Sequence, residues 1–351
     1  MKEIKFDFND ILIIPAAISD IETRTSVNIL DENNMLPIFT APMFDVVNEE
    51  NSDLYNENGI YSIIPRKNEY KPNELVTNNP KKFLALGLDD FIDYFCADRT
   101  RIVIGSNKTA YILIDIANGN MSKLINAVKI SKRTYGSNLV LMVGNIANPE
   151  TYKVLSDAGA DFIRCGIGNG SVCTTTANSS LGAPMGSLIR ETYEMSLSLK
   201  NPAKIIADGG ISSFSDAIKA LALGADFIMS GSMLNKSLES SGQCFEEPRE
   251  NCEITNQQSQ ILFEHNMPVY KEYKGMSTKQ AQKQMGNTRI KTAEGIVKYN
   301  KVEYTLSGWV ENFSDFLKSN MSYCNKSDLK DFIGNVEYNF ITYNAFLRYN
   351  K

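Results

Sequence analysis

The sequence predicts an α/β fold in which eight parallel strands and their helices close into a single-domain (β/α)8 barrel of the TIM type. Short apolar runs alternate with charge-bearing, helix-like segments, as in a parallel sheet with crossover helices. Several runs end in glycine-containing polar loops, which in such barrels lie together at the carboxyl ends of the strands. The length of 351 residues suits one large barrel or two ordinary domains. Because no repeat or Pro/Gly/Ser linker divides residues 1–351, we expect one domain.

The strand candidates are short apolar runs, and the helix candidates are longer segments between them. The eight expected strands are residues 37–41, 60–64, 83–88, 111–115, 139–144, 161–166, 204–208 and 226–231. The expected helices include residues 121–135, 149–158, 188–199 and 213–223, the last with Ser212 or Ser213 as N-cap.

Residues 100–106 also resemble a strand, but only about five residues separate them from Tyr111, whereas a βαβ crossover needs ~10 to 12. We therefore assign the third strand to residues 83–88 and give the extra segment no role.

The amino-acid composition limits the classes of partner that the protein can bind. An aliphatic and aromatic content of 43% with 22% charged residues is typical of a soluble globular protein. A net charge of −5 without a basic cluster argues against a nucleic-acid surface. A small phosphorylated ligand remains compatible, because helix N-termini and backbone amides bind phosphate without net positive charge. No run approaches the roughly 18 apolar residues of a membrane span, so no membrane partner is expected.

Six cysteines without a C-x-x-C pair, after a start that lacks the apolar stretch of a signal peptide, predict free thiols in a reducing, cytoplasmic setting. The single histidine, His265, lies in a polar neighbourhood. Histidine zinc sites and Ser-His-Asp triads are therefore nearly excluded. Acid–base chemistry must fall to carboxylates, hydroxyls, lysines or thiols.

Residues 166–175 read Gly-Ile-Gly-Asn-Gly-Ser-Val-Cys-Thr-Thr and follow an expected strand. Three glycines in five residues let backbone groups come close to a ligand, because no side chain stands in the way. Cys173 is then presented at the mouth of a site as a possible nucleophile. For an isolated turn of this kind, a surface turn followed by a structural thiol is the commoner interpretation. The remaining motifs favour the functional one.

The other expected strands also end in glycine-rich or polar loops, at residues 115–119, 144–145, 208–210 and 231–232. In an eight-stranded βα barrel the active site lies at these ends, and phosphate commonly binds after strands seven and eight. The polar stretch that follows predicts a mobile segment at about residues 236–262.

Taken together, these motifs resemble the inosine-monophosphate dehydrogenase and GMP reductase superfamily along nearly the whole chain. Residues 6–15 are similar to the opening segment of the family, and residues 166–175 to its cysteine loop, G-I-G-P-G-S-x-C-T-T. Residues 207–211 and 223–234 are similar to its ribose and phosphate strands. Tyr-Lys-Gly-Met-Ser at 273–277 matches Y-x-G-M-S and implies an active-site flap at about residues 273–296.

Three features of the sequence resemble the GMP reductase branch of this superfamily. No room follows residues 63–67 for the CBS insert that dehydrogenases usually carry, although some of them lack it. Between Met276 and Glu294 there is one arginine, Arg289, and no tyrosine, so the Arg-Tyr pair with which dehydrogenases activate water is missing. Residues 115–119 read Asp-Ile-Ala-Asn-Gly, the reductase form of this loop.

The resemblance implies NADPH-dependent conversion of GMP to IMP and ammonia, in purine salvage. Cys173 would add to C2 of guanine, and Thr175 and Glu294 would relay the proton that the departing ammonia needs. The implied substrate contacts are Ser171, Asp208, Gly209, Gly210, Gly231, Ser232, Tyr273, Gly275, Met276, Ser277 and Lys291. The implied cofactor contacts are Asp115, Asn118, Gly119, Gly144 and Asn145. Backbone carbonyls of Gly166, Gly168 and Cys173 would ligate a monovalent cation such as K⁺.

The chain departs from the family pattern at Asn169, Thr176, Ser232 and Lys291, where the family usually has proline, arginine, glycine and arginine. Two alternatives therefore stay open. One is an IMP dehydrogenase without CBS motifs that uses Lys291 or Arg289 as base. The other is a purine-nucleotide-binding regulator without efficient catalysis. The resemblance also implies a homotetramer, and it leaves open NADPH against NADH and GMP against a modified guanine nucleotide.

Overall fold

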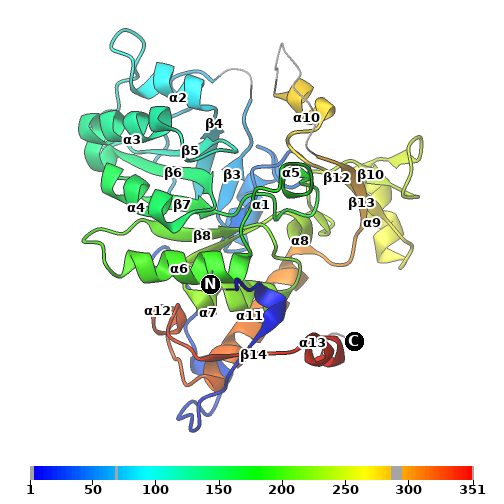
Figure 1. Cartoon of the computed structure of the whole chain (residues 1–351). Coiled ribbons are helices and arrows are strands. Elements are labelled where there is room, and N and C mark those ends of the chain that lie inside the picture. Colours follow the sequence, from blue (N-terminus) through cyan, green and yellow to red (C-terminus); the bar gives the residue numbers. More distant parts are fainter. Residues whose placement is uncertain (1–3, 68–69, 286–294, 350–351) are drawn as a thin grey trace.

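Eight parallel strands form the centre of the computed structural model, which describes residues 4–67, 70–285 and 295–349 (Figure 1). In chain order the strands are β2 (Ile38–Thr40), β3 (Ser62–Ile64), β4 (Lys82–Leu86), β5 (Ala110–Asp115), β6 (Leu139–Ile146), β7 (Phe162–Cys165), β8 (Lys204–Asp208) and β9 (Phe227–Ser230). They are hydrogen-bonded in the order β2, β9, β8, β7, β6, β5, β4, β3.

The ring closes where β2 meets the residue before Ser62. The N–H of Thr40 donates to the C=O of Tyr61 over 2.8 Å, and the N–H of Tyr61 donates to the C=O of Ile38 over 2.9 Å. The predicted TIM barrel is confirmed, and each of the eight predicted strands overlaps an observed one.

Helices cover the outside of the barrel. They are α1 (Ser52–Glu57), α2 (Leu88–Phe95), α3 (Ser122–Tyr135), α4 (Pro149–Ala158), α6 (Met185–Ser196), α7 (Phe214–Leu223) and α11 (Leu306–Tyr323). The short helix α5 (Thr175–Ser179), none of whose residues is buried, follows the loop after β7. In Figure 1, α2, α3, α4 and α6 lie outside the strands that they connect. Ser213 caps α7 as predicted, because its hydroxyl accepts from the N–H of Asp216 while the Asp216 carboxylate accepts from the N–H of Ser213.

Aromatic side chains fill one end of the barrel. Phe39, Phe83, Phe162 and Phe227 contact one another edge to face, with ring centroids 5.1 to 5.8 Å apart. Phe162 and Phe227 are the first residues of their strands, so this layer closes the amino-terminal end. The polar loops lie at the other, carboxyl-terminal end of the barrel.

The chain between β9 and α11 forms a second, antiparallel sheet beside the barrel (Figure 1). Its elements are α8 (Ser232–Asn235), β10 (Cys244–Phe245), β11 (Glu253–Ile254), α9 (Asn256–Glu264), β12 (Tyr270–Lys274), α10 (Lys279–Gln284) and β13 (Val297–Lys301). The strand order is β11, β10, β12, β13. Residues 236–262 thus contain two short strands and most of α9, and their predicted mobility stays a prediction, as does the single-domain organisation. The predicted flap at 273–296 includes α10, and its residues 286–294 lie outside the described residues.

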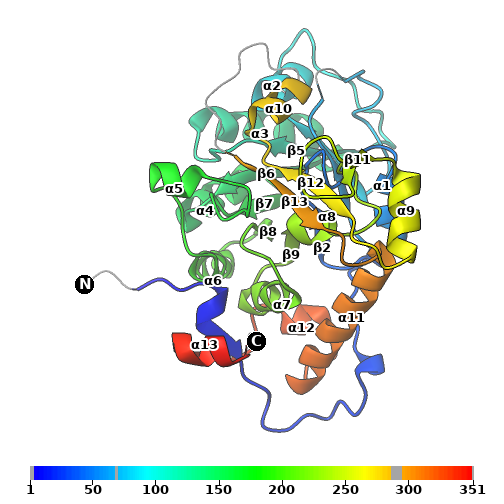
Figure 2. The same ribbon diagram turned by 90° about the vertical axis from the view of Figure 1, so that its right-hand side faces the viewer.

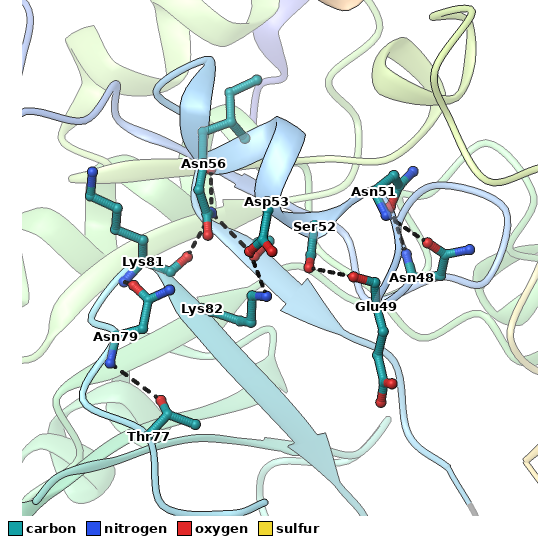
Figure 3. Close-up of polar contacts among 12 residues, drawn as sticks. Asn48, Glu49, Asn51, Ser52, Asp53, Asn56, Thr77, Asn79, Lys81 and Lys82 are labelled. Carbon is teal, nitrogen blue, oxygen red and sulfur yellow. Dashed lines mark hydrogen bonds and ion pairs between the residues drawn. The ribbon is translucent and has the colours of Figure 1, made fainter.

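Asparagines join α1 to its surroundings (Figure 3). The N–H of Asn48 donates to Asn51 Oδ1 over 2.8 Å, and the N–H of Asn51 donates to Asn48 Oδ1 over 2.9 Å. Asn51 Nδ2 also donates to the carbonyl of Glu239, and Asn56 Nδ2 donates to that of Lys81, each over 3.0 Å. The start of the second-sheet segment is therefore tied to the barrel.

Residues 100–106 form no strand. Their chain instead lies against α2 and α3, because the N–H of Ile102 donates to the carbonyl of Tyr94 over 2.8 Å and the hydroxyl of Tyr135 donates to the carbonyl of Ile102 over 2.8 Å. The side chain of Ile102 is buried. Assigning the third strand to residues 83–88 is thereby confirmed by β4.

The two ends of the chain pack together. β1 (Ile11–Ile13) pairs antiparallel with β14 (Tyr338–Phe340), and α13 (Tyr343–Tyr349) lies near the amino-terminal segment (Figure 2). The remaining elements are the 3-10 turns η1 (Phe8–Asp10), η2 (Arg24–Ser26) and η3 (Gly136–Asn138) and the helix α12 (Leu329–Phe332). Within the described ranges, no helix combines the length and apolar character that crossing a membrane would require.

Candidate active site

The loop that carries Cys173 connects β7 to α5 at the carboxyl end of the barrel. It turns at Gly168, whose φ is +80°, and a Cβ there would lie 1.8 Å from Thr176 Oγ1. Only glycine fits this position without rearrangement. The carbonyl of Asn169 accepts from the N–H of Gly210 over 2.9 Å, and Asn169 Nδ2 donates to the carbonyl of Ala183 over 3.1 Å. Asn169, which replaces the family's proline, thus holds the loop to the turn after β8.

Cys173 is a free, half-buried thiol. Its Sγ lies 3.3 Å from Thr175 Oγ1, within hydrogen-bonding distance. The residue pairs in antiparallel fashion with Gly295, and the N–H of Ile296 donates to the carbonyl of Val172 over 3.1 Å. The end of the flap therefore returns to the cysteine loop. The predicted site residues Lys291 and Glu294 lie outside the described residues.

A buried arginine that we did not single out from the sequence links three strand ends. Arg164 on β7 donates through Nη1 to Asp115 Oδ1 over 2.7 Å, and through Nη2 to Asp208 Oδ2 over 2.8 Å. Asn145 Nδ2 donates to the same Asp208 oxygen over 2.6 Å. The side chain of Arg164 is only 8% exposed. Asp115, expected near the cofactor, and Asp208, expected at the ribose, are thus bound to one guanidinium.

Charge pairing keeps this group ionised. Arg66, which follows β3, adds a second cation, with Nε 3.2 Å from Asp115 Oδ2. Burial by itself raises the pKa of Asp115, but Arg66 and Arg164 outweigh it and hold the pKa below its usual value. Burial likewise lowers the pKa of Arg164, and Asp208 and Asp115 reverse that shift and raise it. A charge inside the otherwise apolar run at 162–165 was the sequence signal for this site.

The predicted cofactor residues come together at the ends of β5 and β6. The N–H of Gly119 donates to the carbonyl of Asn145 over 2.8 Å, and the N–H of Asn145 donates to the carbonyl of Ile116 over 2.7 Å. Asn118 is exposed beside them, and Gly144 lies within β6. Asn145 Nδ2 also donates to the carbonyl of Gly166 over 2.7 Å, which joins this rim to the cysteine loop.

The turn after β9 faces a tyrosine from the second sheet. Gly231 follows the last residue of β9, and Ser232 begins α8. A Cβ on Gly231 would lie 2.5 Å from the hydroxyl oxygen of Tyr273, so only glycine lets the phenol approach this closely. Burial, with a smaller contribution from the Asp208 and Asp45 carboxylates, raises the pKa of Tyr273. The phenol therefore stays protonated at neutral pH and can donate a hydrogen bond.

Replacing Gly231 by alanine should displace this phenol. Such overpacking should lower the free energy of unfolding by about 1–3 kcal/mol. The affinity for GMP, the substrate that the resemblance implies, should fall about tenfold through loss of one hydrogen bond to a charged group. Thermal melts and isothermal titration calorimetry with GMP measure both effects. Gly105→Ala is the matched control, because a Cβ there meets nothing within 4 Å. Equal GMP affinity in the two variants would contradict the expected contact.

The remaining predicted residues frame the same opening. The N–H of Gly275 donates to the carbonyl of Ile296 over 3.2 Å, so the turn with Met276 and Ser277 faces the end of the flap. Gly209 and Gly210 form the turn after β8, and a Cβ on Gly209 would lie 3.1 Å from the backbone nitrogen of Gly170. Ser171 is exposed on the cysteine loop. The described members of the predicted site thus gather at the carboxyl end of the barrel.

Comparisons with known proteins identify the family of the chain. The family model described as IMP dehydrogenase / GMP reductase domain matches residues 5–348. GMP reductase of Staphylococcus epidermidis is 30% identical over 336 residues, which cover 93% of each chain. GMP reductase 2 of Mus musculus is 28% identical over 350 residues, covering 94% of this chain and 92% of the mouse protein. GMP reductase of Staphylococcus carnosus is 29% identical over 337 residues, covering 95% of each. The chain therefore belongs to the IMP dehydrogenase / GMP reductase family.

Proposed function

We propose that this protein is a GMP reductase, in which GMP, NADPH and two protons give IMP, NADP⁺ and ammonium. One observation carries the proposal. Cys173 Sγ lies 3.3 Å from Thr175 Oγ1 at the carboxyl end of the barrel, in a chain similar over more than nine-tenths of its length to proteins named GMP reductase. The sequence supports the same branch, because the Arg-Tyr pair of the dehydrogenases is missing.

The nucleotide would lie across the turns after β7, β8 and β9. Ser171, Gly210, Gly231 and Ser232 offer N–H and hydroxyl donors to the 5′-phosphate, and the phenol of Tyr273 adds one more. Gly209 gives the turn after β8 its shape, and Gly275, Met276 and Ser277 would contact the base. Lys291 is proposed as a further substrate contact that keeps the charge of the arginine usual there.

Asp208 would bind the ribose hydroxyls through its second oxygen. Its Oδ2 already accepts from Arg164 and Asn145. Among the described residues, the structure gives Oδ1 no hydrogen bond, so this oxygen can accept from the nucleotide. Arg164 and Asn145 thus hold the carboxylate in one orientation before the ribose arrives.

Cys173 would act as a nucleophile toward C2 of the guanine ring. Its thiolate forms a C2–S bond, and the amino group leaves with a proton that Thr175 and Glu294 relay. NADPH, when bound, supplies the hydride that C2 receives. Cys173 then departs as a thiolate when the C2–S bond breaks, which leaves hydrogen on C2 and regenerates the site. The Arg-Tyr pair with which dehydrogenases activate water is missing from the sequence, which favours hydride transfer over hydrolysis of this covalent state.

The rim formed by Asp115, Asn118, Gly119, Gly144 and Asn145 would hold the nicotinamide ribose, to which the exposed amide of Asn118 offers donors and an acceptor. Gly119 and Gly144 are buried and let Asn145 and Arg164 pack closely against them. The cysteine loop also fits a monovalent cation held by the carbonyls of Gly166, Gly168 and Cys173. The Gly166 carbonyl accepts one hydrogen bond from Asn145 and keeps a second lone pair. The homotetrameric assembly stays a prediction.

Incubation of the protein with GMP and NADPH tests the proposal. We expect the near-ultraviolet absorbance of NADPH to fall, with IMP and ammonium formed in equal amounts, and a parallel assay with NADH decides the cofactor. Formation of XMP from IMP and NAD⁺ would instead identify a dehydrogenase. Tight binding of GMP without any turnover by folded protein would identify a nucleotide-binding regulator.

A further inference from the structure

A buried ion pair joins the loop after β2 to the end of β12. Asp45 and Lys274 are 3% and 4% exposed. Lys274 Nζ donates to Asp45 Oδ1 over 2.8 Å, and the backbone N–H of Lys274 donates to Asp45 Oδ2 over 2.8 Å. One carboxylate therefore holds both the side chain and the main chain of the same residue.

The surrounding polar groups complete this contact. Glu272, two residues earlier on β12, also accepts from Lys274 Nζ. Asn235, at the end of α8 and fully buried, donates through Nδ2 to the carbonyl of Asp45 over 2.8 Å and to that of Glu272 over 2.9 Å. Three segments far apart in the sequence are thus fixed to one another: the loop after β2, α8 and β12.

The ion pair lies next to the proposed phosphate contact. The backbone N–H that Asp45 holds belongs to the peptide between Tyr273 and Lys274, so Asp45 determines where the Tyr273 backbone lies relative to the barrel. Met43, two residues before Asp45, contacts the same tyrosine, with its Sδ 3.4 Å from the phenol oxygen. The loop after β2 therefore touches Tyr273 at the backbone and at the hydroxyl.

Stability alone is a poor explanation for this pair. Burying two charges costs solvation free energy, and apolar residues of similar size often serve a core equally well or better. A carboxylate that accepts hydrogen bonds from both the backbone N–H and the side chain of one residue fixes the position of that residue, which apolar packing does not do. We propose that Asp45 and Lys274 are positioning residues that set the Tyr273 phenol against the 5′-phosphate of the bound nucleotide. This inference rests on the proposed nucleotide site.

Asp45→Glu separates positioning from charge. Glutamate keeps the negative charge but moves the carboxylate by roughly one C–C bond, about 1.5 Å. We expect GMP to bind about tenfold more weakly, as for loss of one hydrogen bond to a charged group, while guanosine, which has no phosphate, binds as it does to the wild type. Isothermal titration calorimetry without cofactor measures both affinities, so the result does not depend on turnover.

Two further variants complete the test. Asp45→Asn with Lys274→Met removes both charges together, so no unpaired charge is left buried, and it should show the same selective loss of GMP. In a Tyr273→Phe background, neither change should weaken GMP binding further. Lys132→Met is the matched control, because its pair with Asp161, 2.8 Å long, lies at the amino ends of β6 and β7.

The outcomes are distinct. The positioning role would be overturned if the folded Asp45→Glu variant bound GMP as tightly as the wild type does. It would also be overturned if the affinities for GMP and guanosine fell equally. If Lys132→Met also lost affinity for GMP but not for guanosine, the effect would be one of general stability. That result would overturn the positioning role too. A wild-type protein that binds neither ligand would instead refute the proposed function on which the inference rests.

Discussion

Replacing Cys173 by alanine should reduce the turnover of GMP by about 10⁴-fold or more, as expected when a covalent nucleophile is removed, and should leave GMP affinity largely intact. The thiol is half-buried and approaches the Thr175 hydroxyl, and the contacts proposed for phosphate and ribose come from other residues. Steady-state kinetics and calorimetry separate the two effects, because only kcat should collapse.

Cys252→Ala is the matched control. Cys252 is also a free, half-buried thiol, but it lies directly before β11, and Arg249 Nε donates to its Sγ over 3.4 Å. Its loss should leave turnover unchanged. Mass spectrometry of wild-type protein quenched during turnover should find a purine nucleotide attached at position 173. Residual activity of Cys173→Ala near that of the wild type, with no such adduct, would refute covalent catalysis.

The strands and their order could be predicted because each one is a local pattern. An apolar run of a few residues between polar loops reports burial on both faces, and a parallel barrel repeats that pattern eight times. The short strands of the second sheet carry no such signal. β10 and β11 have two residues each, too few for any periodicity to be recognised. Their pairing depends on β12, which lies later in the chain.

The ion pairs of the site could not be predicted for a different reason. Arg164 lies 49 residues from Asp115 and 44 from Asp208, and Asp45 lies 229 residues from Lys274. Charge alone does not specify a partner at such separations, and only the closed barrel brings these side chains together. By contrast, Cys173, Asp208 and Gly231 could be selected from the sequence because a glycine-rich turn or a strand end marks each of them. Arg164 is the one charged residue of β7, whereas Lys274 ends a strand that also carries Lys271 and Glu272 and therefore has no such signal.

Replacing Arg164 by methionine should lower the free energy of unfolding by about 3–5 kcal/mol, as for loss of one partner from a buried ion pair. Methionine has a comparable length but leaves Asp115 and Asp208 as buried carboxylates without their shared cation. GMP affinity should fall as well, because Asp208 loses the guanidinium that orients it. Urea denaturation at neutral pH and calorimetry with GMP measure the two losses. Arg24→Met, which removes an exposed pair with Asp315, should cost at most about 1 kcal/mol.

The pH dependence of the free energy of unfolding identifies why Arg164→Met is less stable than the wild type. In the wild type the pKa of Asp115 is held below its unfolded value of 3.8, so its stabilising contribution is complete at neutral pH and is lost only as the pH falls into the acid range. Arg164→Met removes one of the two attractions that lower the pKa of Asp115, so this pKa should be higher in the variant than in the wild type. A carboxyl group with a higher pKa in the folded state loses less stability on acidification. The stability difference between wild type and Arg164→Met should therefore narrow as the pH falls from neutral into the acid range. A difference that stays constant over this range would show that lost packing, and not the buried carboxylate charges of Asp115 and Asp208, destabilises the variant.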